Sequence, residues 1–323
     1  MFSVYVEKPN PDAPLAALRL GQRPEPDILP GWVRVKISHA SLNRHDIFTL
    51  RGITGHDTPI PFPMILGNDG VGRLDDGTEV VLYPLISDPD QSGDETVAPG
   101  WHVLSEKVQG TFAEYAAVPR RNIIPLPTGL SATDASVLGT AWLTAYRMLF
   151  TKARLRPGQT MLVQGATGGM STALIQLGRA AGLTVWATSR SREGMALAER
   201  LGAHAVLADS DQPPGKADAV FDNVGAATWG HSLRSVARGG IIVTTGVTTG
   251  QNVPLDLLPV IVNQITITGS IMGTLDEMRH LLEFVRQNGI RPEIETVVPM
   301  ESAREPIGRM IRGEVRGKIV FTC

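Results

Sequence analysis

Glycine and other small residues are concentrated in one short stretch of the chain, Gly165-Ala-Thr-Gly168-Gly169-Met170-Ser171. An apolar run over 161–164 comes before it, and a helical pattern over 172–181 follows. Glycines at a strand-to-helix turn let backbone N–H groups approach phosphate oxygens, and the helix N-terminus adds partial positive charge. The pattern predicts that the turn from Gly165 to Met170 holds the pyrophosphate of a dinucleotide, with Ser171 in place of the third glycine. The alternative is an ordinary strand–helix turn punctuated by glycine.

The residues after the next expected strand, 184–188, indicate which dinucleotide binds. Sites that take NAD carry an acidic residue about 20 positions after the glycines, where it binds the ribose hydroxyls. Ser189 occupies that place here, and Arg190 and Arg192 follow it. Guanidinium groups match the 2′-phosphate of NADPH, which a carboxylate would repel. We therefore expect NADPH, bound by these three residues. The alternative is two solvated arginines at the start of a helix.

Two further strand ends carry glycine and are expected to line the same site. Asn223-Val224-Gly225 follows a strand pattern over 219–222, and Gly246-Val247 lies at the end of another over 241–245. Ligands in parallel α/β sheets lie at the carboxyl ends of the strands. We therefore predict that these five residues approach the nicotinamide half of the cofactor, although an ordinary loop glycine would explain either segment alone.

Alternating strand and helix patterns from Thr160 onward supply the framework that these segments require. Short apolar strands separated by helices indicate a parallel sheet covered on both faces. Six strands match the doubly wound dinucleotide fold. The expected strands are 161–164, 184–188, 205–207, 219–222, 241–245 and 265–269, and the expected helices between them are 172–181, 193–201 and 229–236.

The remainder of the chain has a different sequence pattern. Residues 1–130 have a β-rich pattern, with short apolar runs between turns rich in proline and glycine. Ser131, with Asp134 three positions later, predicts the start of a helix that continues to about residue 150. The apolar runs are 33–37, 71–74, 79–85 and 112–118, an exposed loop is expected over 87–100, a helix over 275–287, and an extended segment that could return to the first domain over 318–321.

Composition restricts the functional class. The 323 residues carry a formal net charge of −2, so nothing in the charge pattern indicates a nucleic-acid partner. The single cysteine, Cys323, excludes an internal disulfide and a zinc site built on several thiolates. The N-terminal residues lack the pattern of a signal peptide, and the sequence contains no apolar run of about 20 residues. We expect a cytoplasmic protein.

Several motifs resemble the medium-chain dehydrogenase/reductase superfamily, and within it the zinc-independent quinone oxidoreductase-like branch. The resemblance covers almost the whole chain. It implies an α/β fold in which a Rossmann domain, residues 131–273, is inserted into a GroES-like, partly open β-barrel domain made of residues 1–130 and 274–323. The matching pieces are Ser41-Leu-Asn43-Arg-His45-Asp46, Arg51-Gly52, Ile65-Leu-Gly67-Asn68-Asp69-Gly-Val-Gly72, Gly110-Thr-Phe-Ala-Glu-Tyr115, Leu143-Thr144-Ala-Tyr146, the turn at 165–171, Leu201-Gly-Ala203, Phe221–Gly225 and Gly317-Lys318-Ile-Val.

The resemblance also identifies where zinc alcohol dehydrogenases of the superfamily bind their catalytic metal. Asn43 replaces a cysteine, Asn68 a histidine and Asp69 a glutamate, and Thr140 stands about where the third ligand would be. A neutral amide is a poor zinc ligand. The cysteine-rich structural-zinc lobe is also missing from 87–105. His39, His45, His56 and His102 show no zinc-like spacing. We therefore predict no metal.

Chemistry without a metal narrows the reaction. Alcohol oxidation requires a stabilised alkoxide, which zinc provides. In the related short-chain fold, a tyrosine and a lysine four positions after it replace the metal. That pair is absent here, because none of the four tyrosines (Tyr5, Tyr83, Tyr115 and Tyr146) has a lysine four positions later. Hydride addition to a quinone or an enone delocalises the negative charge, so a few hydrogen-bond donors are enough.

By resemblance, Asn43 is the expected donor near the nicotinamide, and Thr144 is expected to help place the cofactor. His45 is a candidate proton donor, and the alternative is a partly exposed loop histidine. Asp46 is expected to anchor Lys318 or backbone, whereas Lys318 could instead contact the pyrophosphate. Residues 265–271 resemble the edge strand through which this superfamily forms dimers.

These expectations combine into one functional hypothesis. We expect an NADPH-dependent, zinc-independent oxidoreductase that transfers hydride to a small quinone, enone or alkenal, and that forms a homodimer without nucleic-acid or membrane partners. Alternatives are an enoyl-thioester reductase of the acyl-CoA type and a non-catalytic NADPH-binding sensor. A zinc alcohol dehydrogenase is the least favoured.

Overall fold

Contacts divide the chain into two units in the computed structural model, which describes residues 1–55, 58–88, 93–208 and 211–323. The first unit comprises Met1–Ala141, Gly273–Gln287 and Ile294–Cys323, so it contains both ends of the chain. The second comprises Trp142–Met272 and Asn288–Glu293. Residues 131–141 group with the first unit rather than with the nucleotide domain. We keep 131 and 273 as proposed domain boundaries.

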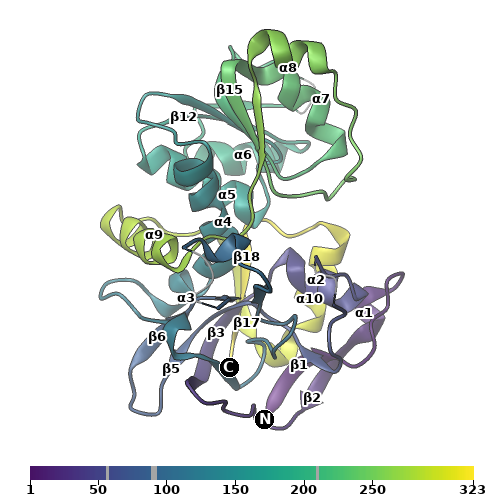
Figure 1. The fold of residues 1–323 in the computed structure, drawn as a ribbon, viewed down its shortest axis with the longest axis vertical. Coiled ribbons are helices and arrows are strands. Elements are labelled where there is room, and N and C mark those ends of the chain that lie inside the picture. The colour runs from purple at the N-terminus through teal and green to yellow at the C-terminus, as the bar shows by residue number, and fades with distance from the viewer. Residues whose placement is uncertain (56–57, 89–92, 209–210) are drawn as a thin grey trace. The chain divides into compact units, whose positions relative to one another are not determined.

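A six-stranded parallel sheet forms the centre of the second unit (Figure 1). The strand order is β13-β12-β11-β14-β15-β16. The chain therefore adds β12 and β13 on one side of β11, and then β14, β15 and β16 on its other side. That order and the parallel pairing confirm the predicted doubly wound fold. Each predicted strand overlaps an observed one: β11 (Thr160–Val163), β12 (Thr184–Thr188), β13 (Ala205–Leu207), β14 (Ala217–Asp222), β15 (Val236–Thr244) and β16 (Thr266–Gly269).

Helices follow most strands of this sheet. The predicted helices correspond to α5 (Gly169–Ala180), α6 (Arg192–Arg200) and α7 (Ala226–Ser235). Ser191 caps α6 by accepting a hydrogen bond from the Gly194 N–H. A further helix, α8 (Leu257–Asn263), was not predicted, and none of its residues is buried. Its apolar residues follow one another almost without interruption, so they show no helical period.

Residues 132–152 form a helical region that is interrupted. It consists of α3 (Ala132–Ala135), a π-helical turn at Leu138–Trp142, α4 (Leu143–Arg147) and a second π-helical turn at Met148–Lys152. The predicted cap is confirmed, because the Ser131 hydroxyl accepts from the Asp134 N–H. The predicted single helix is corrected to these shorter pieces.

Antiparallel sheets dominate the first unit, as the β-rich pattern predicted. The principal sheet has the order β10-β6-β5-β3-β18-β17, with β9 also paired to β3, and a separate sheet has the order β2-β1-β4. The strands are β1 (Phe2–Val6), β2 (Leu18–Gln22), β3 (Trp32–Ser41), β4 (Met64–Ile65), β5 (Asp69–Arg73), β6 (Glu79–Leu82), β7 (Leu85–Ile86), β8 (His102–Val103), β9 (Tyr115–Pro119), β10 (Ile123–Pro125), β17 (Ile294–Pro299) and β18 (Lys318–Thr322).

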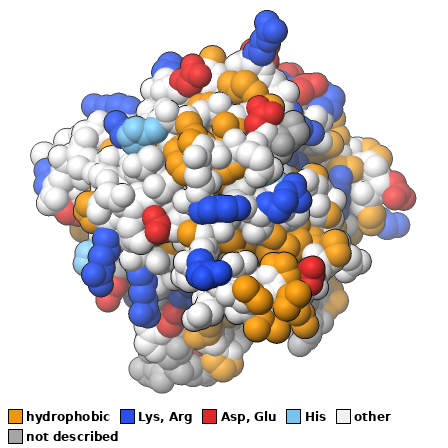
Figure 2. Space-filling view, turned by 90° about the horizontal axis from the view of Figure 1, so that it is seen from above, with side chains coloured by type: hydrophobic (Ala, Val, Ile, Leu, Met, Phe, Trp, Pro, Cys, Tyr) orange, Lys and Arg blue, Asp and Glu red, His pale blue; other side chains and the backbone are white. Residues whose placement is uncertain are grey.

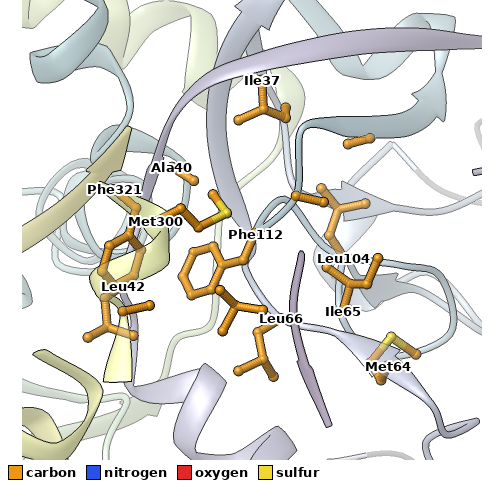
Figure 3. Packing of buried hydrophobic residues seen from close by; sticks show 14 of the residues in the cluster. Ile37, Ala40, Leu42, Met64, Ile65, Leu66, Leu104, Phe112, Met300 and Phe321 are labelled. Atoms are coloured by element: carbon orange, nitrogen blue, oxygen red, sulfur yellow. The ribbon is translucent and has the colours of Figure 1, made fainter. Parts of the chain in front are cut away.

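The C-terminal strand β18 returns to the start of the chain. It pairs antiparallel with β3, with Val320 opposite Ser41, and parallel with β17. Phe321 packs edge to face against Phe112, with ring centroids 5.0 Å apart (Figure 3). Leu42 lies beside the two rings in the same core (Figure 3). The expected return to the first domain is therefore confirmed, and apolar packing stabilises it.

Some elements of the first unit differ from the expectation. The helices α1 (Pro14–Ala17), α2 (Arg44–Arg51) and α10 (Arg304–Arg312) were not predicted, whereas α9 (Leu275–Gln287) was. In the predicted exposed loop 87–100, Glu95 and Thr96 are buried in a 3-10 turn, and residues 89–92 lie outside the described residues. Within the described ranges, no helix is both long enough and apolar enough to cross a membrane.

Candidate active site

The glycine-rich turn joins the end of β11 to the start of α5, as predicted. Gly168 caps α5 without a side-chain hydrogen bond, and apart from its own chain neighbours no described residue lies within 4 Å of where its Cβ atom would be. The first N–H groups of a helix have no partner within the helix, so this end offers open donors to an anion. Ser171 is fully buried, and its hydroxyl donates to the Gln164 carbonyl at 3.4 Å. Serine therefore fits the place of the third glycine.

The segment after β12 carries two available positive charges. Arg190 and Arg192 are exposed, and neither guanidinium has a hydrogen bond or an ion pair with another residue that the structure describes. Ser189 is buried at 4% exposure. A Cβ atom at Gly194 would lie 2.2 Å from Ser189 Oγ and 2.7 Å from Thr167 Cγ2, so the start of α6 packs closely against the turn.

The two loops that follow β14 and β15 approach each other where their glycines lie. A Cβ atom on Gly246 would lie 2.3 Å from the Asn223 carbonyl oxygen. Gly225 has a φ of +94°, and a Cβ atom there would lie 2.5 Å from the Gly250 carbonyl oxygen. Both glycines are needed for this contact between loops. Val247 is 52% exposed beside it.

The start of α2 in the first unit is held by Asp46. Its Oδ2 accepts from the Asn43 N–H and its Oδ1 from the Gly67 N–H, both at 2.8 Å. This agrees with the expected role as a backbone anchor. Burial raises the pKa of Asp46 to about 6, while the hydrogen bonds from Asn43 and Gly67 act in the opposite direction.

Asn43, Asp69 and Lys318 are buried and, with the half-buried Thr140, form one polar cluster in the first unit. Asp69 Oδ2 accepts from the Ser41 hydroxyl and from Asn43 Nδ2, each at 2.8 Å. Asp69 Oδ1 accepts from the Thr140 hydroxyl at 2.5 Å. Neighbouring strands create this arrangement, because Ser41 at the end of β3 pairs with Asp69 at the start of β5. Ser41 was not assigned a role from the sequence, because its partner lies on another strand.

The expected donor role of Asn43 does not agree with its contacts. Its Nδ2 donates to Asp69 Oδ2 and to the Ser41 carbonyl, and its Oδ1 accepts from Lys318 Nζ at 2.5 Å. An amide NH₂ group has two protons to donate. Both are used here, so this arrangement leaves Asn43 no proton to offer a substrate.

The expected contact of Lys318 with a pyrophosphate is corrected by its position. The side chain is 2% exposed, and its ammonium donates to the Leu42 carbonyl and to Asn43 Oδ1. Asp69 Oδ2 lies 3.5 Å away. Burial lowers the pKa of Lys318, and the Asp69 carboxylate opposes that shift. The ammonium therefore makes its hydrogen bonds inside the first unit.

His45 lies on α2, and not in a loop. Its Nε2 is 3.0 Å from Glu106 Oε1, and its Nδ1 is buried without a hydrogen-bond partner among the described residues. Glu106 also accepts from the Val103 N–H, which fixes the carboxylate. Nothing in the sequence pattern indicated Glu106. Thr144, which is expected to help place the cofactor, is 3% exposed on α4 of the second unit.

Comparison with known proteins identifies the family. Residues 29–128 match a model described as alcohol dehydrogenase GroES-like domain, and residues 169–287 match one described as zinc-binding dehydrogenase. The chain belongs to the medium-chain dehydrogenase/reductase superfamily. Its first unit therefore contains the predicted GroES-like domain, and the fold of this superfamily binds a nicotinamide cofactor.

Similar members of the superfamily carry different names. An alcohol dehydrogenase from Geobacillus stearothermophilus is 28% identical, over 94% of this chain and 95% of its own. A putative quinone oxidoreductase, YhfP, from Bacillus subtilis is 27% identical, over 91% of each chain. The crystal structure of an NAD-dependent alcohol dehydrogenase superposes with a TM-score of 0.91 at 29% identity, with both chains fully covered.

The residues at the superfamily's metal position do not fit a metal in this chain. Both Asp69 oxygens accept hydrogen bonds, and the Asn43 oxygen accepts from an ammonium. Asn68 Nδ2 donates to the Leu104 carbonyl, and its buried Oδ1 has no hydrogen-bond partner in the part of the chain that the structure describes. A single neutral oxygen is not a zinc ligand set. His56 lies outside the described residues, and within those residues no group of three or more His, Cys, Asp or Glu could hold a metal.

Proposed function

We propose that this protein is an NADPH-dependent, zinc-independent reductase of quinones or α,β-unsaturated carbonyl compounds. The observation that carries the proposal is the Lys318 ammonium, which lies 3.5 Å from Asp69 and within hydrogen-bond distance of Asn43. A cation already neutralises the carboxylate at the place where zinc dehydrogenases bind their metal. A second cation there would meet repulsion at short range.

A reaction with delocalised charge suits this arrangement. When bound, the dinucleotide supplies a hydride to the substrate. Addition of that hydride to a quinone or to the β-carbon of an enone leaves a phenolate or enolate, which takes up one proton. Such an anion needs hydrogen-bond donors but no Lewis acid. We propose that His45 is a proton donor, that Thr144 places the cofactor, and that Asn43 positions Asp69 instead of contacting the substrate.

The preference for NADPH rests on charge at the end of β12. Arg190 and Arg192 are exposed without partners among the described residues, and the residue before them is a serine and not an acid. Two guanidinium groups beside the ribose site would pair with a 2′-phosphate. The turn at Gly168 and the loops at Gly225 and Gly246 would hold the rest of the dinucleotide.

A second copy of the chain is the proposed partner. Strand β16 is at the edge of its sheet, and such an edge offers unpaired backbone groups to another strand. Leu257, Leu258, Ile261 and Val262 on α8 are all more than half exposed. Exposed apolar patches of this kind mark interaction surfaces, and Figure 2 shows hydrophobic side chains gathered in patches on the face seen from above.

Oxidation of NADPH at 340 nm tests the proposed function. The substrate panel contains quinones, alkenals and enoyl-CoA thioesters, and the reverse assay contains primary and secondary alcohols with NADP⁺ and NAD⁺. We expect turnover of quinones or alkenals, unchanged by chelator, in protein that elemental analysis shows to be free of zinc. Activity lost on chelation and restored by zinc would overturn the proposal, and selective turnover of thioesters would reassign the substrate. Tight NADPH binding without any turnover would indicate a sensor.

A further inference from the structure

A buried side-chain network underlies the glycine-rich turn. Gln164, the residue before Gly165, is fully buried, and its amide has three side-chain partners. Its Nε2 lies 2.8 Å from His231 Nδ1 and 3.0 Å from the Ser232 hydroxyl. Its Oε1 lies 2.9 Å from the Thr188 hydroxyl at the end of β12. Three elements, β11, β12 and α7, are therefore joined through one side chain.

The Ser232 hydroxyl fixes the orientation of the Gln164 amide. It donates its one proton to Asp222 Oδ2, so it can only accept from Gln164, and the NH₂ group of Gln164 must therefore face Ser232 and His231. Gln164 Oε1 then accepts from the Thr188 hydroxyl, which itself accepts from the Gly165 N–H at 3.2 Å. His231 Nδ1 can accept from the NH₂ group only if it is unprotonated. The other ring nitrogen carries the proton and donates to the Asp211 carbonyl at 2.9 Å.

The network continues to the loop after β14. The Ser232 hydroxyl donates to Asp222 Oδ2 at 2.7 Å. Asp222 Oδ1 accepts from the backbone N–H groups of Val224 and Gly225, each at 3.0 Å. Asp222 is fully buried, as is Ser232. The phosphate turn and the loop expected at the nicotinamide half are thus tied to the same helix, α7.

We propose that Gln164 and His231 are positioning residues for the dinucleotide, acting through Thr188 and Asp222 on the two loops without contacting it. This inference rests on the proposed nucleotide site. Each element of the network lies at the carboxyl end of a strand or on the helix behind it, where the fold binds its ligand. Fully satisfied buried networks fix one arrangement of their members. The turn therefore has a fixed conformation before the dinucleotide binds, which reduces the conformational entropy lost on binding.

Paired substitutions test the role of the network. Thr188→Val removes the hydroxyl at constant shape and leaves the Gly165 N–H and Gln164 Oε1 without it, whereas Thr188→Ser keeps it. We expect the dissociation constant for NADPH, from quenching of tryptophan fluorescence, to rise about tenfold in Thr188→Val and to stay within about twofold in Thr188→Ser. The KM for NADPH should rise with it while kcat stays nearly constant.

The other end of the network gives an independent pair. His231→Leu removes the acceptor for Gln164, and His231→Asn keeps an acceptor at the position of Nδ1. Asn should restore most of the affinity that Leu loses. Ser136→Ala is the control, because that buried hydroxyl donates to the Thr133 carbonyl within its own helical region, and we expect this variant to leave affinity unchanged.

Three results separate the possibilities. The positioning role would be overturned if Thr188→Val bound NADPH as tightly as Thr188→Ser, and His231→Leu as tightly as His231→Asn. All four variants must first be shown by circular dichroism to be folded. Wild-type protein that binds neither NADPH nor NADH would overturn the nucleotide site itself. If Thr188→Val does not fold, the His231 pair alone decides between these outcomes, since Leu is close to His in volume.

Discussion

The ammonium of Lys318 lies 3.5 Å from the Asp69 carboxylate, and both side chains are almost fully buried. Asn43 bridges them, because its Nδ2 donates to Asp69 and its Oδ1 accepts from Lys318. A buried carboxylate needs compensation for the water that it loses. In this chain the compensation comes from an amine on the last strand of the first unit, at the place where zinc dehydrogenases of the superfamily use a metal.

Removal of the lysine should therefore destabilise the protein. Lys318→Met leaves the Asp69 carboxylate buried without a cation, and we expect the free energy of unfolding to fall by about 3 kcal/mol. Urea denaturation followed by circular dichroism measures the change. The double variant Lys318→Met/Asp69→Asn should recover part of the loss, since no buried charge remains. A double variant as unstable as the sum of the single variants would contradict the pairing.

The raised pKa of Asp46 predicts a pH dependence with a definite sign. The folded-state pKa of about 6 is above the ordinary value of 3.8, so between these values the folded protein holds a proton that the unfolded chain has released. The contribution of Asp46 to stability is therefore present below about pH 4 and is lost as the pH rises to about 6, by roughly 3 kcal/mol.

Comparison with Asp46→Asn isolates that contribution from other titrating groups. The difference in unfolding free energy between wild type and variant, measured by urea denaturation at pH 4 and at pH 7, should shift in favour of the variant at the higher pH. A difference independent of pH would show that Asp46 titrates normally.

The two arginines after β12 should control the choice of cofactor. Arg190→Ala and Arg192→Ala each remove a partner for the 2′-phosphate, so we expect the KM for NADPH to rise about tenfold and that for NADH to stay the same. Initial rates with both cofactors measure this. Arg238→Ala provides the matched control, because Arg238 is exposed on the same unit, near the opposite ends of the strands. Preference for NADH in wild type, unaffected by Arg190→Ala, would refute the assignment.

The apolar face of α8 should be needed for self-association. Ile261→Glu places a charge on a side chain that is 68% exposed, and burial of that charge between two copies would be unfavourable. We expect wild type to sediment as a dimer and Ile261→Glu as a monomer in analytical ultracentrifugation. Val97→Glu, at an equally exposed position on the first unit, should remain dimeric. A monomeric wild type would remove the proposed partner.

The local sequence pattern was sufficient to predict the sheet of the second unit. Most of its strands are short apolar runs, and buried parallel strands require that pattern. The strands could therefore be placed within a few residues, except for the start of β15, which lies five residues before the predicted strand. The glycine-rich turn could also be predicted from the sequence, because it needs particular residue types in a fixed order. Helix α8 was missed because its apolar residues follow one another almost without interruption and so show no helical period. The π-helical turns at 138–142 and 148–152 leave no local signal.

The contacts of the candidate site depended on tertiary structure. Type and order of residues along the chain determined the doubly wound fold, the phosphate turn and the absence of the usual zinc ligands at positions 43 and 68. Only folding decided that Lys318 would meet Asn43, 275 residues earlier, and that His231 would meet Gln164, 67 residues earlier. The physical reason is that strand pairing and burial bring such groups together, and a buried polar atom takes whichever partner the packing supplies.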